Sequence, residues 1–228
     1  MAAQVVEKKS YRDKRRVFRD RKDAGSVLGE MLEPYRGSGA SVFAIPAGGV
    51  PVAARAAEML SLPLDVCVVS KITLPWSSEA GYGAVSFDGT VRLNSAMLPH
   101  LKMSSADVEK GIEETKRKVM KRANIFRGPA PFPDLSDCTA ILIDDGLASG
   151  ITMSVAALSL KNAGAKSLVI AVPTGHAESV AQVAAEVDTL YCANIRSGFS
   201  FAVADAYEMW TDVTETEASS ILKRFQEP

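Results

Sequence analysis

The residues best suited to chemistry in this chain are two adjacent carboxylates, Asp144 and Asp145, which directly follow the apolar run 140–143. That run is short, uncharged and rich in branched side chains, a pattern that predicts a strand buried on both faces of a parallel sheet. Open α/β sheets bind ligands at the carboxyl ends of their strands, where the two acids would lie. Carboxylates in that place can accept hydrogen bonds from the vicinal hydroxyls of a sugar or provide oxygen ligands to Mg²⁺.

A loop of mostly small residues follows the acids and leads into a predicted helix over 152–162. Small residues let backbone N–H groups close around a phosphate, and the helix would add its unpaired amides and the positive end of its dipole. We therefore predict a phosphate site formed by Gly146, Leu147, Ala148, Ser149, Gly150 and Thr152. The alternative is an ordinary strand-to-helix turn in which Thr152 is the N-cap.

Ala47, Gly48 and Gly49 lie in a second loop, between a predicted strand over 42–46 and a predicted helix over 52–60. Paired glycines allow backbone conformations closed to other residues, so backbone amides can approach a second anion such as pyrophosphate. The alternative is a tight strand-to-helix turn. Lys71 follows a further predicted strand, over 64–70, where its ammonium group must reach either solvent or an anion.

Short apolar runs alternate with helical stretches along the chain, which predicts the α/β class with a mostly parallel twisted sheet flanked by helices. The remaining predicted elements are strands over 167–172 and 189–192 and a helix over 177–186. A long charged helix is expected from Ser104 to about residue 126, with Ser104 and Asp107 as its cap, followed by a stiff proline-rich linker.

Residues 74–94 have little regular pattern and predict a mobile flap or a small hairpin. A lid in this position would keep water from a reactive sugar carbon, and Glu79 and Tyr82 are its polar candidates. Solvated loop residues are the alternative for both.

The composition fits one globular domain, because 228 residues with 47% hydrophobic and 23% charged content suffice for a full core. A net charge of −1 gives no field toward nucleic acid or a membrane, and the basic run 8–22 is typical of solvated helical surface. No signal peptide or membrane-spanning run is visible, so a cytoplasmic protein is expected. Cys67, Cys138 and Cys192 suggest neither disulfides nor a zinc site, and the first and last are expected in the core.

The segment 140–152 resembles the signature by which type I phosphoribosyltransferases bind phosphoribosyl pyrophosphate (PRPP): four apolar residues, two acids, a few small or apolar residues, Thr or Ser, Gly, any residue and Thr. The resemblance implies the type I fold, with Asp144 and Asp145 at the ribose hydroxyls and at Mg²⁺, directly or through ribose or water. It implies that the loop 146–152 binds the 5′-phosphate. It also implies that Ala47, Gly48, Gly49 and Lys71 bind the pyrophosphate, with an unusual cis peptide bond expected at Ala47-Gly48.

The resemblance extends over roughly residues 17–225 to a group of uncharacterised predicted phosphoribosyltransferases of bacteria and archaea, through the segments 18–25 and 79–85 and both loops. Ala47 departs from this group, which usually carries arginine there, and Ser70 stands where arginine is common. A single domain over 1–228 is implied, with a hood from about 1–25 and 194–215 and a lid or insert over about 74–130. Arg19 and Arg21 are candidates to fold over the active site as part of the hood.

In the hood, Phe199 or Phe201 would stack on a flat base and Asp205 would read its edge; a hydrophobic plug at the sheet edge is the alternative. The expected reaction is Mg²⁺-dependent transfer of the 5-phosphoribosyl group to a nitrogenous base, purine slightly favoured, in nucleotide metabolism. Asp144, Asp145 and Lys71 would be the catalytic residues, acting by position and charge.

The alternative function is a PRPP- or nucleotide-sensing module of the same fold without turnover, which Ala47 favours. An unrelated phosphatase is disfavoured because the loop after Asp144 has the wrong register for a nucleophilic acid. A homodimer is expected because related enzymes commonly pair, and neither nucleic acid nor a membrane is expected as a partner.

Overall fold

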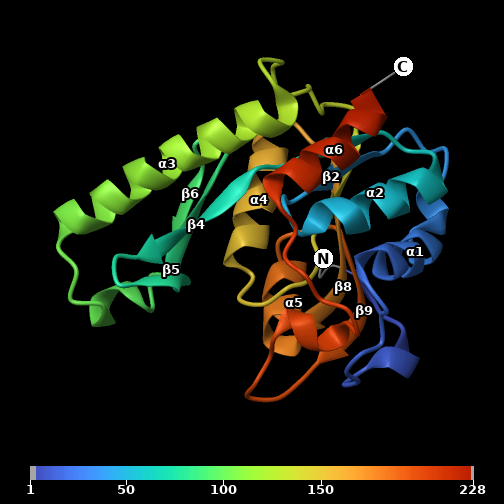
Figure 1. The fold of residues 1–228 in the computed structure, drawn as a ribbon, viewed down its shortest axis with the longest axis horizontal. Helices are drawn as coiled ribbons and strands as arrows, with labels where there is room; N and C mark the ends of the chain where they lie inside the picture. The colour runs from blue at the N-terminus through green and yellow to red at the C-terminus, as the bar shows by residue number, and fades with distance from the viewer. Residues whose placement is uncertain (1–3, 227–228) are drawn as a thin grey trace.

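Parallel strands form the central sheet of the protein (Figure 1). The structure is a computed structural model that describes residues 4–226, apart from the side chains of Ser78, Glu79 and Gln226. Across these residues the sheet has the strand order β1-β9-β8-β7-β2-β3, and every neighbouring pair is parallel. Its strands are β1 (Gln4–Val6), β2 (Ser41–Ala44), β3 (Leu64–Val66), β7 (Thr139–Ile143), β8 (Ser167–His176) and β9 (Thr189–Arg196).

Helices cover both faces of this sheet because side chains alternate along each strand. Val42 and Ile141 pack toward α1 (Arg21–Met31) and α2 (Gly49–Leu60), whereas Phe43 and Leu142 pack toward the opposite face. That opposite face is covered by α4 (Ile151–Asn162) and α5 (Ala177–Ala184), while α6 (Glu215–Gln226) packs against α2. These elements form the body of the protein. None of the helices within the described residues is long and apolar enough to cross a bilayer.

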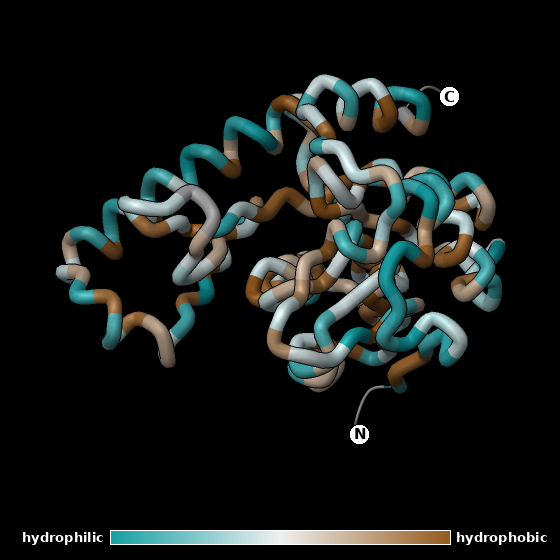
Figure 2. The backbone as a smooth tube through the Cα atoms, turned by 60° about the horizontal axis from the view of Figure 1, so that its bottom comes forward, coloured by the Kyte–Doolittle hydropathy of each residue, from teal (hydrophilic) through white to brown (hydrophobic). Residues whose placement is uncertain are grey.

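An arm projects from the body and consists of three antiparallel strands covered by one long helix (Figure 1). Its elements are β4 (Val69–Leu74), β5 (Ser77–Ser86), β6 (Val91–Leu93), the short helix η3 (Leu98–His100) and α3 (Ser105–Arg127). Figure 2 shows α3 as a largely hydrophilic tube with hydrophobic residues at intervals. The predicted cap is confirmed, because Ser104 and Asp107 form a reciprocal capping box.

The prediction of one strand over 64–70 is wrong, because the chain changes sheets between Cys67 and Val68. The Cys67 N–H still donates to the Ala44 carbonyl at 2.9 Å, whereas the Val68 carbonyl accepts from the Phe87 N–H at 2.9 Å. The first half therefore ends the central sheet and the second half begins the arm. This change of sheet carries Lys71 onto the arm.

The other predicted strands and helices are confirmed with shifted ends. Helices α1 and α6 were not predicted, nor were β1 and the short helices η1 (Lys9–Tyr11), η2 (Glu33–Tyr35) and η4 (Val203–Ala206). Cys67 and Cys192 are buried in the core, as predicted.

The two chain ends meet over the carboxyl edge of the sheet. The Phe18 N–H donates to the Ala206 carbonyl at 3.0 Å, and the Glu208 N–H donates to the Phe18 carbonyl at 2.8 Å. Phe18 also packs against the Tyr207 ring at a centroid distance of 5.6 Å. This pairing fixes the start of α1, and with it the position of Arg21.

Candidate active site

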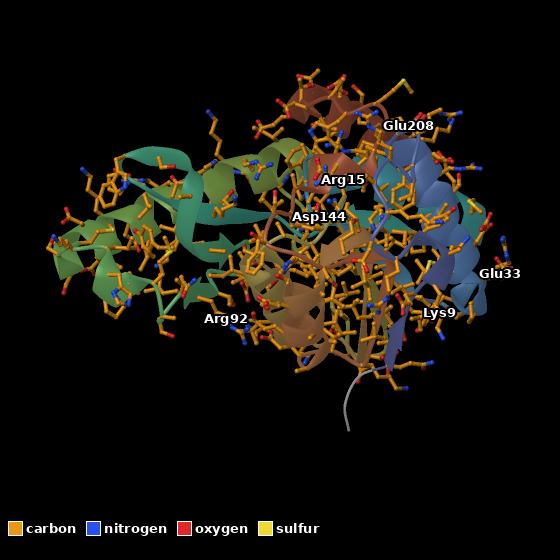
Figure 3. All side chains as sticks on the ribbon, turned by 90° about the horizontal axis from the view of Figure 1, so that it is seen from below. Lys9, Arg15, Glu33, Arg92, Asp144 and Glu208 are labelled. Carbon is orange, nitrogen blue, oxygen red and sulfur yellow. The ribbon has the colours of Figure 1, made fainter. Side chains whose placement is uncertain are left out.

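The two acids of the sequence motif lie directly after β7, at the carboxyl edge of the central sheet. Figure 3 shows Asp144 in the middle of the molecule, between the arm and the N-terminal helix. The Asp145 N–H donates to Asp144 Oδ1 at 2.8 Å, which turns the Asp144 carboxylate back over its own backbone. Asp144 lines a cavity of about 320 Å³, together with residues from the phosphate loop and the arm.

Gly48 and Gly49 pack against the acids, and Gly48 does not have the special backbone conformation that we predicted for this pair. Gly48 has φ −58° and ψ −36°, ordinary helical values that any residue can adopt. A Cβ on Gly48 would lie 2.2 Å from Asp145 Oδ2, and a Cβ on Gly49 would lie 2.9 Å from the Asp144 Cα. Space, rather than a special backbone conformation, therefore requires glycine at both positions.

Asp145 is held by Arg21, which the sequence had marked as a hood candidate. Arg21 Nε donates to Asp145 Oδ2 at 2.9 Å, and Arg21 Nη1 donates to the Thr211 carbonyl at 2.6 Å. The guanidinium lies 3.8 Å from the centroid of the Trp210 ring, a cation–π contact. The Tyr207 hydroxyl donates to the Asp145 carbonyl at 2.7 Å. Arg19, the other hood candidate, is instead paired with Asp20 at the surface.

Burial shapes the protonation of this cluster. Loss of hydration raises the pKa of Asp144 well above its usual range, and the neighbouring Asp145 carboxylate raises it further. Burial also raises the pKa of Asp145, although the Arg21 guanidinium opposes that rise. The pKa of the Tyr207 hydroxyl is raised well above its usual value, chiefly by burial. A cation or hydrogen-bond donor that entered beside Asp144 would favour its charged form.

The loop after the acids forms one wall of the cavity, lined by Gly146, Leu147, Ala148, Ser149, Gly150 and Thr152. Gly150 has φ +78°, which favours glycine, and it serves as the N-cap of α4. Helix α4 begins at Ile151, so the alternative in which Thr152 is the N-cap is wrong. The first amides of α4 lack partners within the helix and are suited to an anion.

Leu147 is an exception within this loop. Its N–H donates to the Thr174 carbonyl at 2.9 Å, and its carbonyl accepts from the His176 N–H at 3.0 Å. Its side chain is 2% exposed and belongs to the core on the α4 face. We had predicted that Leu147 binds phosphate, but its amide is already used to join the loop to β8.

The loop 45–49 also borders the cavity, which Ile45 and Pro46 line. The cis peptide bond lies at Pro46-Ala47, so the expectation of Ala47-Gly48 was displaced by one residue. Gly48 already has helical backbone angles as the first residue of the turn into α2. The Gly49 N–H donates to the Ile45 carbonyl at 3.1 Å, so this amide is used within the loop rather than offered to a ligand.

The arm supplies the cationic side chains of the cavity, namely Lys71, Lys118 and Arg122. Lys71 lies on β4, as an exposed residue. Sequence reasoning missed Lys118 and Arg122, because their helix reads as an ordinary charged surface helix and no local pattern distinguishes one of its basic residues from another. Only the docking of α3 on β4 reveals them.

Tyr82 does not have the predicted place on a lid. It is fully buried between the arm strands and α3, where its hydroxyl donates to the Val108 carbonyl at 3.4 Å. A Cβ on Gly111 would lie 2.1 Å from the Tyr82 hydroxyl, so glycine at this position of α3 leaves the space that the tyrosine side chain occupies. Tyr82 thus contributes to the packing of the arm. The side chain of Glu79 lies outside the described residues.

The predicted base-binding residues follow β9, and none of them lines the Asp144 cavity. Phe199 is fully exposed, which also excludes it from a hydrophobic plug. Phe201 packs on His176 with ring centroids 5.7 Å apart. Asp205 pairs with Arg196 at 3.0 Å, so its carboxylate is engaged within the protein.

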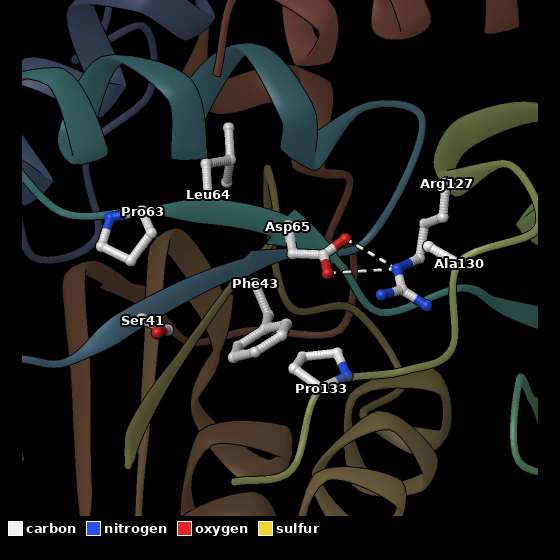
Figure 4. Close-up of a pocket in the computed structure, with 8 residues that line it drawn as sticks. All are labelled: Ser41, Phe43, Pro63, Leu64, Asp65, Arg127, Ala130 and Pro133. Atoms are coloured by element: carbon white, nitrogen blue, oxygen red, sulfur yellow. Dashed lines mark hydrogen bonds and ion pairs between the residues drawn. The ribbon is translucent and has the colours of Figure 1, made fainter. Parts of the chain in front are cut away.

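A second cavity, of about 400 Å³, lies near the start of β2 and is lined by Ser41 and Phe43 (Figure 4). Its charged residues neutralise each other, because Arg127 Nε donates to the Asp65 carboxylate at 2.8 and 3.1 Å. Ser41 begins the strand whose other end leads to Pro46. This cavity therefore lies at the amino edge of the sheet, opposite the acids.

The residues around Asp144 fit Mg²⁺, which prefers oxygen ligands and is usually held by one or two carboxylates together with substrate phosphates and water. Asp144 presents a carboxylate to the cavity, whereas Asp145 is engaged by Arg21 at 2.8 Å. Asp144 is therefore the acid of the two whose carboxylate forms no ion pair in the described part of the chain, and the role of Asp145 at Mg²⁺ stays a prediction. Within residues 4–226 no group of three or more His, Cys, Asp or Glu side chains is arranged for a metal ion.

Comparisons with known proteins agree with this geometry. The model of the family described as the phosphoribosyl transferase domain matches residues 22–206. Two Mycobacterium tuberculosis proteins named as predicted phosphoribosyl transferases, from strains CDC 1551 and H37Rv, are each 33% identical to the chain over 209 residues, or 92% of it. The chain spans about half the length of these curated relatives, 47%.

A solved structure extends the likeness to the whole fold. The crystal structure of TT1426 from Thermus thermophilus is 30% identical and covers 91% of this chain and 98% of its own, with a TM-score of 0.74. The parallel sheet with flanking helices is thus the α/β fold of type I phosphoribosyltransferases, and the chain belongs to the phosphoribosyl transferase domain family.

Proposed function

We propose that this chain transfers the 5-phosphoribosyl group of PRPP to a nitrogenous base, a purine before a pyrimidine, and releases pyrophosphate. One observation carries the proposal: Asp144, the loop 146–152 and Lys71 face a single cavity of about 320 Å³. PRPP carries a phosphate at one end of its ribose and a pyrophosphate at the other. Its ribose hydroxyls can donate hydrogen bonds to the Asp144 carboxylate, and its two anionic groups can bind the amides of the loop and the ammonium group of Lys71.

The loop and the start of α4 bind the 5′-phosphate through backbone amides and the hydroxyls of Ser149 and Thr152. Asp144 accepts hydrogen bonds from the ribose hydroxyls. Mg²⁺, when bound beside Asp144, would neutralise pyrophosphate charge. Arg21 keeps Asp145 in place, so this second acid supports the loop geometry from behind rather than binding the sugar.

In the reaction the bond from the anomeric carbon to the pyrophosphate oxygen breaks, and a bond from that carbon to a base nitrogen forms. The pyrophosphate leaves with the electron pair, and the nitrogen loses its proton. The arm's cations stabilise the departing charge, and its position over the cavity limits the access of water. No protein side chain need act as the nucleophile.

The proposal is tested by measuring pyrophosphate release from PRPP and Mg²⁺ with adenine, hypoxanthine, guanine, xanthine, uracil and orotate. We expect release with at least one base, and a loss of at least about a hundredfold in Asp144→Asn, the range for removing a charge-stabilising group from an active site. Asp137→Asn, an exposed acid at the other end of β7, is the matched control and should be fully active.

A sensing module without turnover is the second candidate, and Ala47 in the loop favours it. Tight PRPP binding with no pyrophosphate release from any base would support the sensor and overturn the transferase. Absence of both binding and release would overturn both candidates.

A further inference from the structure

The cavity that contains Asp144 is lined by basic side chains that come from the arm. Lys71, Lys118 and Arg122 line it, against the one carboxylate of Asp144. A cavity lined by several basic side chains suits a polyanionic ligand.

Arg122 is largely occupied by the protein. Its guanidinium donates to the Pro46 carbonyl at 3.0 Å, to Ser70 Oγ at 3.2 Å, to the Val69 carbonyl at 3.4 Å and to Glu215 Oε1 at 2.9 Å. These bonds join α3 to the loop 45–49, to β4 and to α6. A guanidinium has five N–H donors, and most of those of Arg122 are used in these bonds. Arg122 therefore acts mainly to hold α3 in place at the cavity.

Lys118 lies one helical turn before Arg122, on the same face of α3. It is exposed, and within residues 4–226 its ammonium has no ion-pair partner, unlike Lys116 on the same helix, which pairs with Glu113 at 2.7 Å. The contacts of Arg122 thus hold the ammonium group of Lys118 at the part of the cavity that Pro46, Ser70 and Lys71 line.

We propose that Lys118 binds the pyrophosphate portion of the ligand, and that Arg122 is a positioning residue that places it there. The inference rests on the proposed function and adds to it a cationic contact from a helix outside the sequence motif. Lys118 lies one helical turn from Arg122, which hydrogen-bonds Ser70 and Pro46, so we assign it to the pyrophosphate, the group expected beside the loop 45–49 and Lys71. The basic side chains of the arm would then neutralise the charge of the pyrophosphate, which Ala47 and Ser70 cannot do because both are uncharged.

The test is calorimetric titration of the full chain with three ligands, PRPP with Mg²⁺, inorganic pyrophosphate with Mg²⁺ and ribose 5-phosphate, in wild type, Lys118→Ala and Lys121→Ala. Lys121 is exposed on the same helix but does not line the cavity, so its variant is a matched loss of charge. We expect Lys118→Ala to bind PRPP and pyrophosphate about tenfold more weakly and ribose 5-phosphate unchanged, because one charge-assisted contact is lost. Lys121→Ala should match wild type with all three ligands.

Two outcomes separate this inference from the proposed function. Unchanged pyrophosphate binding in Lys118→Ala, or an equal loss for ribose 5-phosphate, would overturn the role of Lys118 while the proposed function stands. Failure of the wild type to bind either PRPP or ribose 5-phosphate would overturn the proposed function and this inference with it. Alanine is a strong helix former, so the variant is expected to fold, and its far-UV circular dichroism checks this.

The positioning role of Arg122 is tested by a double-mutant cycle with Arg122→Lys, which keeps the charge but loses the forked contacts. We expect Lys118→Ala to weaken pyrophosphate binding less in the Arg122→Lys background, about twofold instead of about tenfold. Equal effects of Lys118→Ala in both backgrounds would overturn the positioning role.

Discussion

The acidic loop of the body and the arm contribute to the same cavity but are held in different ways. Asp144 and the loop 146–152 are continuous in sequence, and backbone hydrogen bonds such as that from Leu147 to Thr174, at 2.9 Å, fix them to the sheet. Lys71, Lys118 and Arg122 reach the cavity from a separate layer, docked largely through side chains. The proposed sugar-phosphate site is therefore fixed by the sheet itself, whereas the position of the basic side chains depends on how the arm packs against the body.

Two ion pairs make this difference measurable. Arg21 and Asp145 meet at 2.8 Å with side chains only 9% and 16% exposed. Arg92 of β6 and Glu186, which follows α5, meet at 2.7 Å with side chains 39% and 27% exposed, and this pair joins the arm to the body. Removing each arginine should have very different consequences, because a buried charge left without its partner is far more costly than an exposed one.

The largest effect is expected for Arg21→Ala, which leaves the buried Asp145 carboxylate unpaired and removes the contact with Trp210. The free energy of unfolding should fall by about 3 kcal/mol, which lowers Tm by about 6–12 °C for a chain of this size. Urea unfolding of Arg21→Ala beside Arg19→Ala, whose pair with Asp20 is exposed, measures it. A loss of unfolding free energy no greater than that of the Arg19 control would contradict the stabilising role that we assign to the ion pair between Arg21 and Asp145.

An intermediate effect is expected for Asp144→Asn, and it depends on pH. The pKa of Asp144 is raised in the folded protein, so above its usual 3.8 the folded state keeps a proton that the unfolded state has lost. Stability therefore falls as pH rises through that window, and asparagine, which has no proton to lose, removes the fall. The Tm of Asp144→Asn should exceed that of wild type by a margin that grows as the pH rises above about 4, by about 2–4 °C for each kcal/mol of difference in the free energy of unfolding.

Thermal melts across this pH range check the prediction, with Asp137→Asn as the control at an exposed acid. A Tm difference that is constant with pH, or that shrinks as pH rises, would contradict the assigned burial of Asp144.

The smallest effect is expected for Arg92→Ala at the arm. Because its pair with Glu186 is partly exposed, the free energy of unfolding should fall by only about 0.5 kcal/mol. The difference should shrink further at high salt, where exposed charges are screened. Urea unfolding at low and high salt measures this, with Arg117→Ala, an exposed arginine of α3, for comparison. A loss as large as that of Arg21→Ala would erase the distinction between the two regions.

The same division decides what the sequence could predict. The acids, the small-residue loop and the capping box of α3 are local patterns, and the structure has the strand, the helix start and the cap where those patterns lie. The strand over 64–70 was mispredicted because its apolar run is continuous in sequence and nothing local marks the change of sheet after Cys67. Local composition shows the elements but not which sheet each one joins.

Local sequence patterns could not predict contacts between residues that are far apart in the chain. Arg21 and Asp145 are 124 positions apart, and Arg122 and Pro46 are 76 apart. Tyr82 was predicted as a lid residue because the segment 74–94 has little regular pattern, whereas its burial depends on the space left at Gly111, a residue of another element. Side chains that complete a site from a neighbouring layer become visible only once the layers are packed.

The central claim is that Asp144 and the loop 146–152 bind one phosphorylated ribose. Its most direct test is calorimetric titration of PRPP with Mg²⁺ into wild type, Asp144→Asn and Asp137→Asn. We predict one binding site in wild type and in Asp137→Asn, and at least about tenfold weaker binding in Asp144→Asn, which loses a charged hydrogen-bond acceptor. Equal affinity in all three proteins would contradict the claim.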